Sequence, residues 1–230
     1  MSRFKSFRLA VCAALCLLGF GSASATSFNL VANSSFESPP HAGVTVRYST
    51  PGVPAGFSWT VGGAGVDLVE THWTAQDGLQ SLDLNQDVGH PTSFLTPPGS
   101  VSQSLATVAG APYLISFWMA ANADNDFPSD TGPATKTMDV GFNSTVHSYS
   151  FDVTGHTLAD PGWIQQQFIA IATGVNTNLS FVSTSSGYAG MIIDNVSVSV
   201  IPEPSTHAML LAGLGLLGFA ARRWTRKETA

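Results

Sequence analysis

The chain has 230 residues, of which 44% are hydrophobic and only 10% are charged. This length supports one well-packed core, and the hydrophobic content excludes an intrinsically disordered chain. Between residues 26 and 201, two basic residues stand against thirteen carboxylates, which gives this body a formal charge of −11. Such a body repels nucleic acid and anionic membranes, and it suits divalent cations or neutral polymers.

Residues 1–25 have the three parts of a secretory signal peptide. Basic residues at positions 3, 5 and 8 precede an apolar run over 9–20, and Ala-Ser-Ala at 23–25 is a small-residue cleavage site. A short N-terminal membrane anchor is the alternative, although the run is short for a span and polar sequence follows it. Both cysteines lie inside this segment, so the mature protein is expected to fold without a disulfide.

Residues 26–200 contain about ten segments in which apolar and polar residues alternate with a period of two, the pattern of half-buried strands. The segments are 57–61, 80–84, 101–105, 113–120, 138–142, 149–153, 163–171, 179–181 and 191–200. Turn-rich pieces separate them, and no helical period precedes residue 205. The pattern predicts an all-β domain, an antiparallel jelly-roll β-sandwich.

Several stretches of this body resemble a known family. They are NLVANSSFESP, DGLQSLDLN, GSVSQSLATVAGAPYLISFWMA, GPATKTMDV and YAGMIIDNVSV. In order and spacing they resemble the choice-of-anchor C family, a close relative of the DUF642 proteins. Both are similar to galactose-binding-like and carbohydrate-binding jelly rolls. The resemblance implies a β-sandwich with no assigned enzymatic activity, joined to an exchangeable surface anchor.

Asp194 is the most informative single residue of the body. Strand parity predicts that it shares the core face with Ile192 and Val196, where an unpaired carboxylate costs several kcal/mol. The resemblance to related jelly rolls implies that Asp194 and Glu37 share one structural Ca²⁺, completed by backbone carbonyls. The alternative is that Asp194 accepts hydrogen bonds from turn amides and that Glu37 is solvated.

The loop NADNDFPSD offers a second, weaker calcium pattern. Asn122, Asp124 and Asp126 follow the spacing of an EF-hand loop. Phe127 and Pro133 stand where that loop requires Gly and Glu, so we reject an EF-hand. A solvated acidic turn is expected, with a loose surface calcium site as the alternative.

Exposed aromatic rings would indicate sugar binding, because rings stack on the apolar faces of sugars. Trp118 and Trp163 lie within apolar strands and are expected to pack in the core. Trp73, in ETHWTAQDG, has acidic and polar neighbours and is the best candidate for an exposed glycan-binding ring. Trp59 and Tyr188 are further candidates.

Signals for catalysis are weak, since neither G-x-S-x-G nor H-E-x-x-H occurs. His72 near Glu70 and Asp77 offers a metal or acid–base cluster. Asp67 with Glu70 offers a carboxylate pair for glycoside hydrolysis, which requires both groups in one cleft. We expect no enzymatic activity and keep a secreted hydrolase as an alternative.

Residues 205–221 carry no formal charge and would form a helix of about 25 Å, close to the lower limit for crossing a bilayer of roughly 30 Å. We expect one transmembrane helix here, with the body outside and the C-terminus in the cytoplasm because basic residues follow directly. These basic residues are Arg222, Arg223, Arg226 and Lys227.

The tripeptide Pro202-Glu203-Pro204 precedes this apolar run, and its two prolines hold Glu203 in the extended form that a processing enzyme binds. Tripeptide, apolar helix and basic cluster together resemble the PEP-CTERM sorting signal, over residues 201–227. That signal occurs in Gram-negative bacteria that make exopolysaccharide. The resemblance implies processing by an exosortase, a membrane transpeptidase-like enzyme; an anchor that is never cut is the alternative.

The sequence therefore predicts a non-enzymatic surface or extracellular-matrix protein. We expect export through the inner membrane, a transient membrane anchor, and release to the cell surface or matrix. Exopolysaccharide or a cell-wall glycan is the expected partner beside the exosortase. A carbohydrate-binding module with a defined glycan site is the alternative to a purely structural role.

Overall fold

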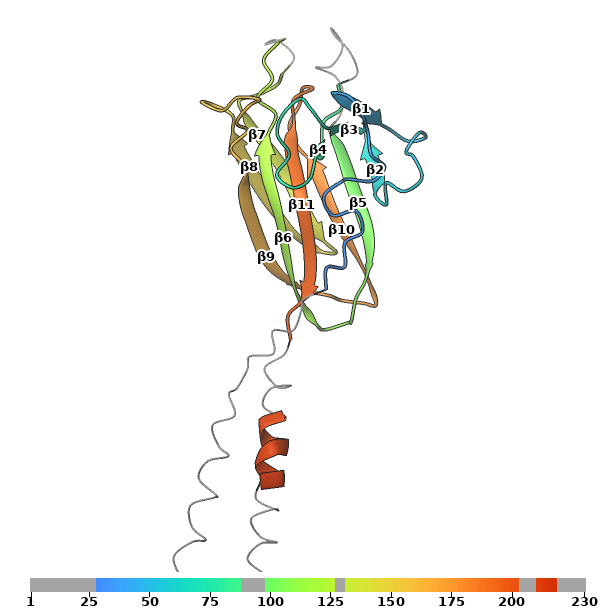
Figure 1. Ribbon diagram of the computed structural model, residues 1–230, viewed down its shortest axis with the longest axis vertical. Helices are drawn as coiled ribbons and strands as arrows, with labels where there is room; N and C mark the ends of the chain where they lie inside the picture. Colours follow the sequence, from blue (N-terminus) through green and yellow to red (C-terminus); the bar gives the residue numbers. More distant parts are fainter. Residues whose placement is uncertain (1–27, 88–97, 127–130, 203–209, 219–230) are drawn as a thin grey trace, which may run out of the picture.

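The computed structural model describes residues 28–87, 98–126, 131–202 and 210–218. Its strands form two antiparallel sheets that pack face to face (Figure 1). The six-stranded sheet has the order β1 (Thr45–Tyr48), β3 (Val66–Val69), β4 (Ser81–Asp83), β11 (Met191–Val200), β6 (Pro112–Ala121) and β9 (Ile164–Ile171). The five-stranded sheet has the order β2 (Thr60–Gly63), β5 (Gly99–Ala106), β10 (Asn176–Ser183), β7 (Thr135–Phe142) and β8 (Thr145–Asp152).

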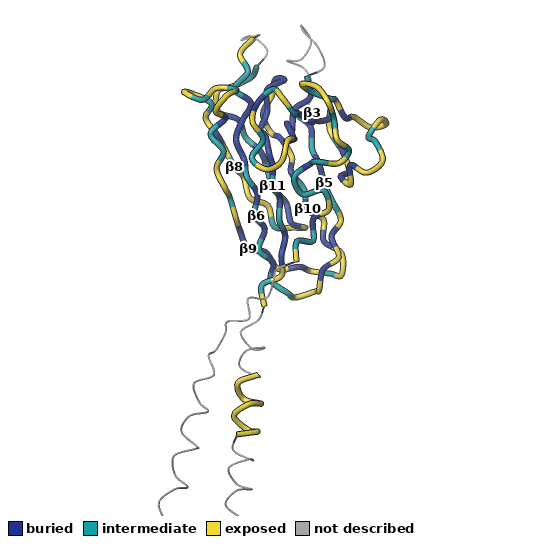
Figure 2. Tube along the Cα trace, viewed as in Figure 1, coloured by how far each residue is buried: buried dark blue, intermediate teal, exposed yellow. Residues whose placement is uncertain are grey.

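The core lies between the two sheets (Figure 2). On β6, every second residue, such as Ile115 and Phe117, is fully buried, whereas Leu114 and Ser116 on the other face are partly exposed. Phe117 meets Phe181 of β10 edge to face, with 5.1 Å between ring centroids. Burial of this apolar surface is the main stabilising term of such a domain. The predicted antiparallel β-sandwich is thus confirmed.

All nine predicted segments overlap a strand, but β1 and β3 were not predicted. Each has only four residues, too short for a period-two pattern to be recognised. All four residues of β3 are buried, because this strand is covered on both faces.

The prediction that Asp194 faces the core between the sheets is wrong, because β11 contains a bulge. Asp194 pairs with Trp118 and Val198 pairs with Ile115, with a register shift between Asp194 and Ser197. Asn195 takes φ = 46° at this shift. Because a bulge inserts one residue, Val198 faces the core between the sheets, whereas Asp194 faces outward. Asp194 is nevertheless fully buried, since loops cover this outer face.

The segment before β1 runs beside β11 where β4 ends. Leu30 N donates to the Val198 carbonyl at 2.9 Å, and Val196 N donates to the Ser34 carbonyl at 2.9 Å. The side chain of Asn29 bonds Val196 and Val198 on either side. The two ends of the domain are therefore neighbours.

In the tail, the described helix covers residues 210–218, and its leucines are exposed. Across the described residues, no helix combines the length and hydropathy needed to cross a membrane. The remainder of the predicted transmembrane segment 205–221 and the whole signal peptide 1–25 lie outside the described residues. Both stay predictions.

Candidate functional site

One row of side chains on the outer face of the six-stranded sheet forms the base of the candidate site. Directly opposite residues of antiparallel strands project to the same side. The register therefore places five residues of neighbouring strands in line: Arg47, Asp67, Asp83, Ile192 and Ala120. Two carboxylates thus lie next to each other on β3 and β4, with Arg47 beside them.

The loop between β3 and β4 folds back over this face. The indole Nε1 of Trp73 donates to Ser81 Oγ at 2.7 Å, and Trp73 is only 5% exposed. From the other side, Trp163 Nε1 donates to the carbonyl of Thr74 at 3.0 Å. The loop therefore forms a wall over the row of side chains.

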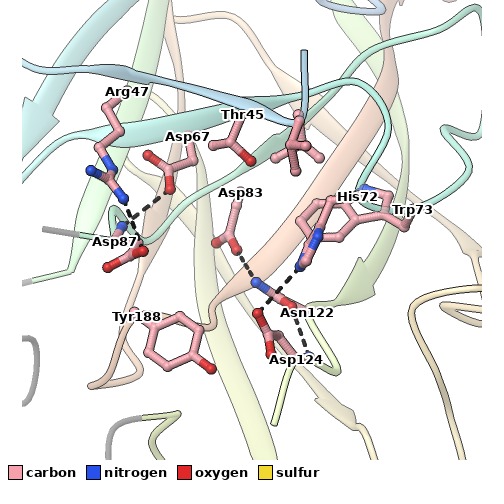
Figure 3. A pocket seen from close by; sticks show the side chains of 12 residues that line it. Thr45, Arg47, Asp67, His72, Trp73, Asp83, Asp87, Asn122, Asp124 and Tyr188 are labelled. Carbon is pink, nitrogen blue, oxygen red and sulfur yellow. Dashed lines mark hydrogen bonds and ion pairs between the residues drawn. The ribbon is translucent and has the colours of Figure 1, made fainter. Parts of the chain in front are cut away.

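The row and the loop enclose a pocket of about 200 Å³, which we call the acidic pocket (Figure 3). Its polar and aromatic lining residues are Thr45, Arg47, Asp67, His72, Trp73, Asp83, Asp87, Asn122, Asp124 and Tyr188. Two ion pairs lie at its rim: Arg47 with Asp87 at 2.9 Å, and His72 with Asp124 at 3.2 Å. Carboxylates outnumber the cations, so the pocket favours neutral or positively charged groups.

The two central carboxyl groups differ in their hydrogen bonds. Asp83 accepts from Asn85 N at 2.8 Å on one oxygen and from Asn122 Nδ2 at 2.9 Å on the other. Asp67 accepts from Asp87 N through Oδ2 at 3.1 Å. Its Oδ1 is buried and has no hydrogen-bond partner within the described ranges. Asp67 thus brings an unused acceptor to the pocket.

Burial changes the protonation of this pair. Loss of solvent, together with the charge of the neighbouring Asp83, raises the pKa of Asp67 to about 8. Burial also raises the pKa of Asp83 to about 7, against the hydrogen bonds from Asn85, Asn122 and Gly190. Lys136 is only 1% exposed, and burial lowers its pKa to about 8 against the attraction of Asp83.

Two further cavities adjoin the acidic pocket. A cavity of about 550 Å³ shares the wall formed by His72 and Trp73. Another, of about 320 Å³, shares Asn122 and Asp124. The acidic pocket therefore borders both other cavities, and its two shared walls adjoin at the His72–Asp124 pair.

The proposed calcium ligands Glu37 and Asp194 hold the same loop from two sides. Glu37 Oε1 accepts from the backbone N of Leu79 and Gln80 at 2.9 and 2.8 Å. Asp194 Oδ2 accepts from the backbone N of Gln76 and Asp77, both at 2.9 Å. In the described part of the chain, no group of three or more His, Cys, Asp or Glu side chains is arranged to hold a metal ion. A calcium site at this pair stays a prediction.

Asp194→Ala is expected to lower the free energy of unfolding by about 2–3 kcal/mol. The change removes the acceptor of the part-buried hydrogen bonds from the Gln76, Asp77 and Asn195 amides, and a buried donor left without an acceptor costs roughly 1–3 kcal/mol. Urea denaturation of the full chain in detergent micelles measures the loss. Glu37→Ala is the matched comparison, and its loss should be smaller because Glu37 is partly exposed. Equal losses for the two variants would contradict the expectation that the more buried carboxylate contributes more to stability.

The expected exposure of Trp73 is wrong. Its neighbours in sequence are polar, but the loop folds back and places the indole against Ser81. Because Trp73 lines two of the three cavities, contact with a glycan stays a prediction. Trp59 is 4% exposed, and Trp163 packs against the core cluster as expected. Trp118 lies on the outer face and is partly exposed.

The acid–base groupings expected from the sequence are not those that form. His72 pairs with Asp124, whereas Glu70 accepts from Gly43 N and Asp77 accepts from Ser35 Oγ. Asp67 lies next to Asp83, and that pairing was missed. The sequence signal for this pairing is weak: Asp67 is the second residue of the short run VDLV, and Asp83 is the last residue of the short run SLD.

The EF-hand-like loop contributes to the pocket in a different way. Asn122 donates to Asp83, and its own side chain accepts from Asp124 N. These bonds orient the start of the loop toward the six-stranded sheet.

In the sorting signal, Pro202 is exposed. Glu203, Pro204 and the basic cluster Arg222, Arg223, Arg226 and Lys227 lie outside the described residues.

Comparison with solved structures finds several similar β-sandwich domains. The cleaved adhesin domain K1 of Lys-gingipain from Porphyromonas gingivalis W83 aligns with a TM-score of 0.49 and 16% identity, covering 70% of this chain and 100% of that one. TmCBM61 in complex with β-1,4-galactotriose aligns at 0.46 and 18%, covering 76% and 100%. The CBM22-1 xylan-binding domain of Paenibacillus barcinonensis Xyn10C aligns at 0.43 and 19%, covering 77% and 97%.

Among curated proteins, halomucin of Haloquadratum walsbyi is 28% identical over 193 residues. The match covers 80% of this chain but only 2% of halomucin. The profile of the PEP-CTERM protein-sorting motif matches residues 200–227. The profile described as Protein of unknown function (DUF642) matches residues 29–199, which is most of the chain. The chain therefore belongs to the DUF642 family and carries a PEP-CTERM sorting motif at its C-terminal side.

Proposed function

We propose that this protein is exported, held at the membrane by its tail, and then processed by an exosortase to become a cell-surface or matrix component. The observation that carries the proposal is the position of the motif. The sandwich ends with β11 at Val200, and the sorting motif begins at residue 200. All members of the core cluster lie between Val31 and Val198. Cleavage beyond Pro202 would therefore release a domain whose core is complete.

We further propose that the sandwich binds an extracellular polysaccharide through the acidic pocket. Carboxylates, an amide and a guanidinium supply planar hydrogen-bonding groups for sugar hydroxyls, and Trp73 and Tyr188 supply aromatic surface. The body, with its formal charge of −11, would repel an anionic polymer. A neutral or cationic polysaccharide fits this surface better.

The pocket is better suited to binding than to hydrolysis. A glycosidase needs one protonated carboxyl group and one ionised carboxylate free to act on the sugar or on water. Asp83 is only 2% exposed, and both of its oxygens accept hydrogen bonds from the protein. We therefore propose a non-enzymatic role, and incubation of the full chain with the host polysaccharide tests it: no shortening of the polymer is expected.

Glu203→Ala is expected to leave the tail uncleaved, because the change removes the charge of the Pro-Glu-Pro tripeptide. Intact mass spectrometry of protein from the native envelope and medium measures this. We expect the wild-type protein to lack residues 1–25 and the part of the tail beyond the tripeptide, and the variant to retain its tail.

Glu228→Ala is the matched control, since Glu228 is the other carboxylate of the tail. It should be processed like the wild-type protein. A wild-type protein that keeps its tail through Ala230 would contradict the sorting proposal.

A further inference from the structure

We propose that the acidic pocket selects an amino-sugar unit with a free, protonated amine, placed against Asp67. This inference rests on the polysaccharide binding proposed above and specifies its ligand class. The polymer would be a polysaccharide of partly or wholly de-N-acetylated hexosamine. The ammonium group would meet the carboxyl group of Asp67, next to Asp83, and the hydroxyl groups of the same sugar would meet the surrounding polar side chains.

The unused oxygen of Asp67 is the first reason. Asp67 is 6% exposed and lines the pocket, and its buried Oδ1 has no hydrogen-bond partner among the residues described. Figure 3 shows its carboxyl group beside that of Asp83. A buried acceptor without a donor is unfavourable, and more so when it is charged. An ammonium group carries three donors and no acceptor, so it matches this site.

The charges around the pair give the second reason. The cations nearest to it have other partners: Arg47 donates to Asp87 at 2.9 Å, and Lys136 Nζ donates to the Thr131 carbonyl. His72 is paired with Asp124 at 3.2 Å. A positive charge brought by the ligand would therefore neutralise a carboxylate that no protein cation contacts directly.

The surroundings favour a sugar over a bare metal ion. Calcium requires about six to eight oxygen ligands. The described residues contain no group of three metal-ligating His, Cys, Asp or Glu side chains. Thr45, His72 and Asn122 line the pocket instead and bring a hydroxyl, an imidazole and an amide group to it.

The two cavities that adjoin the acidic pocket favour a polymer. The acidic pocket, at about 200 Å³, is smaller than the roughly 300–1,000 Å³ of most ligand pockets, so it suits one small unit. The adjoining cavities of about 550 and 320 Å³ lie beyond its two shared walls. A polysaccharide with one amino sugar in the acidic pocket would extend its neighbouring units into these adjoining cavities.

Isothermal titration calorimetry with two matched oligosaccharides tests the inference. The full chain in detergent micelles is titrated with a tetramer of β-1,4-glucosamine and with the corresponding N-acetylated tetramer, near pH 6. We expect the free-amine tetramer to bind at least roughly tenfold more tightly, about 1.4 kcal/mol. Asp67→Asn should abolish this preference. Asp139→Asn, on the outer face of the five-stranded sheet, is the charge-matched control and should preserve it.

A second readout needs no substitution. Because the empty pocket holds Asp67 largely protonated near pH 6, binding of an ammonium group should release a proton from it. Titrations in buffers of different ionisation enthalpy measure this release, and the N-acetylated tetramer should cause none.

Three outcomes would count against the inference or its basis. Equal affinity for both tetramers would overturn the amino-sugar preference while leaving glycan binding intact. Binding of Ca²⁺ alone that Asp67→Asn abolishes, without a preference for the amine, would overturn it in favour of a metal site. If neither tetramer nor the host polysaccharide binds, the proposed glycan binding itself fails.

Discussion

Gly99→Ala is expected to destabilise the sandwich strongly, with a loss in the free energy of unfolding above the roughly 1–3 kcal/mol typical of overpacking. Gly99 begins β5, and its N donates to the Leu84 carbonyl at 2.9 Å. A Cβ there would lie 1.8 Å from the carbonyl oxygen of Gly65 and 2.7 Å from that of Leu84. Both contacts are to backbone, so no side-chain rotation relieves them, and the strands must separate.

Urea denaturation of the full chain in detergent micelles measures this loss. Gly174→Ala is the control, because the nearest atoms to its added Cβ are at 3.7 and 4.0 Å, and its effect should be within about 1 kcal/mol. If the two variants were equally stable, the close approach of β5 to residues 65 and 84 would be contradicted.

The second large effect is an increase in stability on mild acidification. Burial raises the pKa of Asp67 to about 8 and those of Asp83 and Asp194 to about 7, from an ordinary value of 3.8. Between about pH 4 and pH 7–8, the folded state therefore binds more protons than the unfolded state. The free energy of unfolding then falls as pH rises, by up to about 1.4 kcal/mol per pH unit for each such group.

The charged groups around these three carboxyls do not reverse the fall of the free energy of unfolding with rising pH. Asp67 faces Asp83, Arg47 and Asp87, and burial outweighs the attraction of Arg47. Lys136 lies near Asp83, and Asp77 near Asp194, where its charge raises the pKa further. The lowered pKa of Asp152 acts only below about pH 4, outside this window.

Denaturation curves at about pH 5, 6, 7 and 8 measure the effect, and stability should be highest near pH 5. Asp67→Asn should flatten the dependence between about pH 6 and 8, because it removes one of the titrating groups. Asp139→Asn is again the control and should leave the slope unchanged. A stability that rises from pH 5 to pH 8 would refute the assignment of these buried carboxyls.

The sequence predicted the strands well, because burial on one face forces the alternation seen in runs such as YLISFWMA. It also predicted the sorting motif, whose prolines, apolar run and basic cluster are contiguous. Both signals are local, since each depends on residues that are close together along the chain. The burial of Asp194 was likewise expected, because an acid stands within an apolar strand.

The site could not be predicted in the same way. Asp67 and Asp83 are neighbours only because β3 pairs with β4. His72 and Asp124 follow β3 and β6, two strands that are separated in the sheet by β4 and β11. Trp73 has polar neighbours, but its exposure is decided by the path of the loop over the sheet. The prediction that Asp194 faces the core assumed regular alternation along β11, and the bulge at Asn195 breaks that alternation.

By itself, the sequence determined an all-β body, its acidic charge and a C-terminal sorting motif, because composition and periodicity along the chain specify these features. Only the tertiary structure decided that Asp67 and Asp83 adjoin, that Trp73 is covered and that three cavities border one another. The reason is physical: strand register and loop packing are fixed by burial of the whole sheet surface. Chemical groups far apart in the chain are then brought together at a place that no local pattern records.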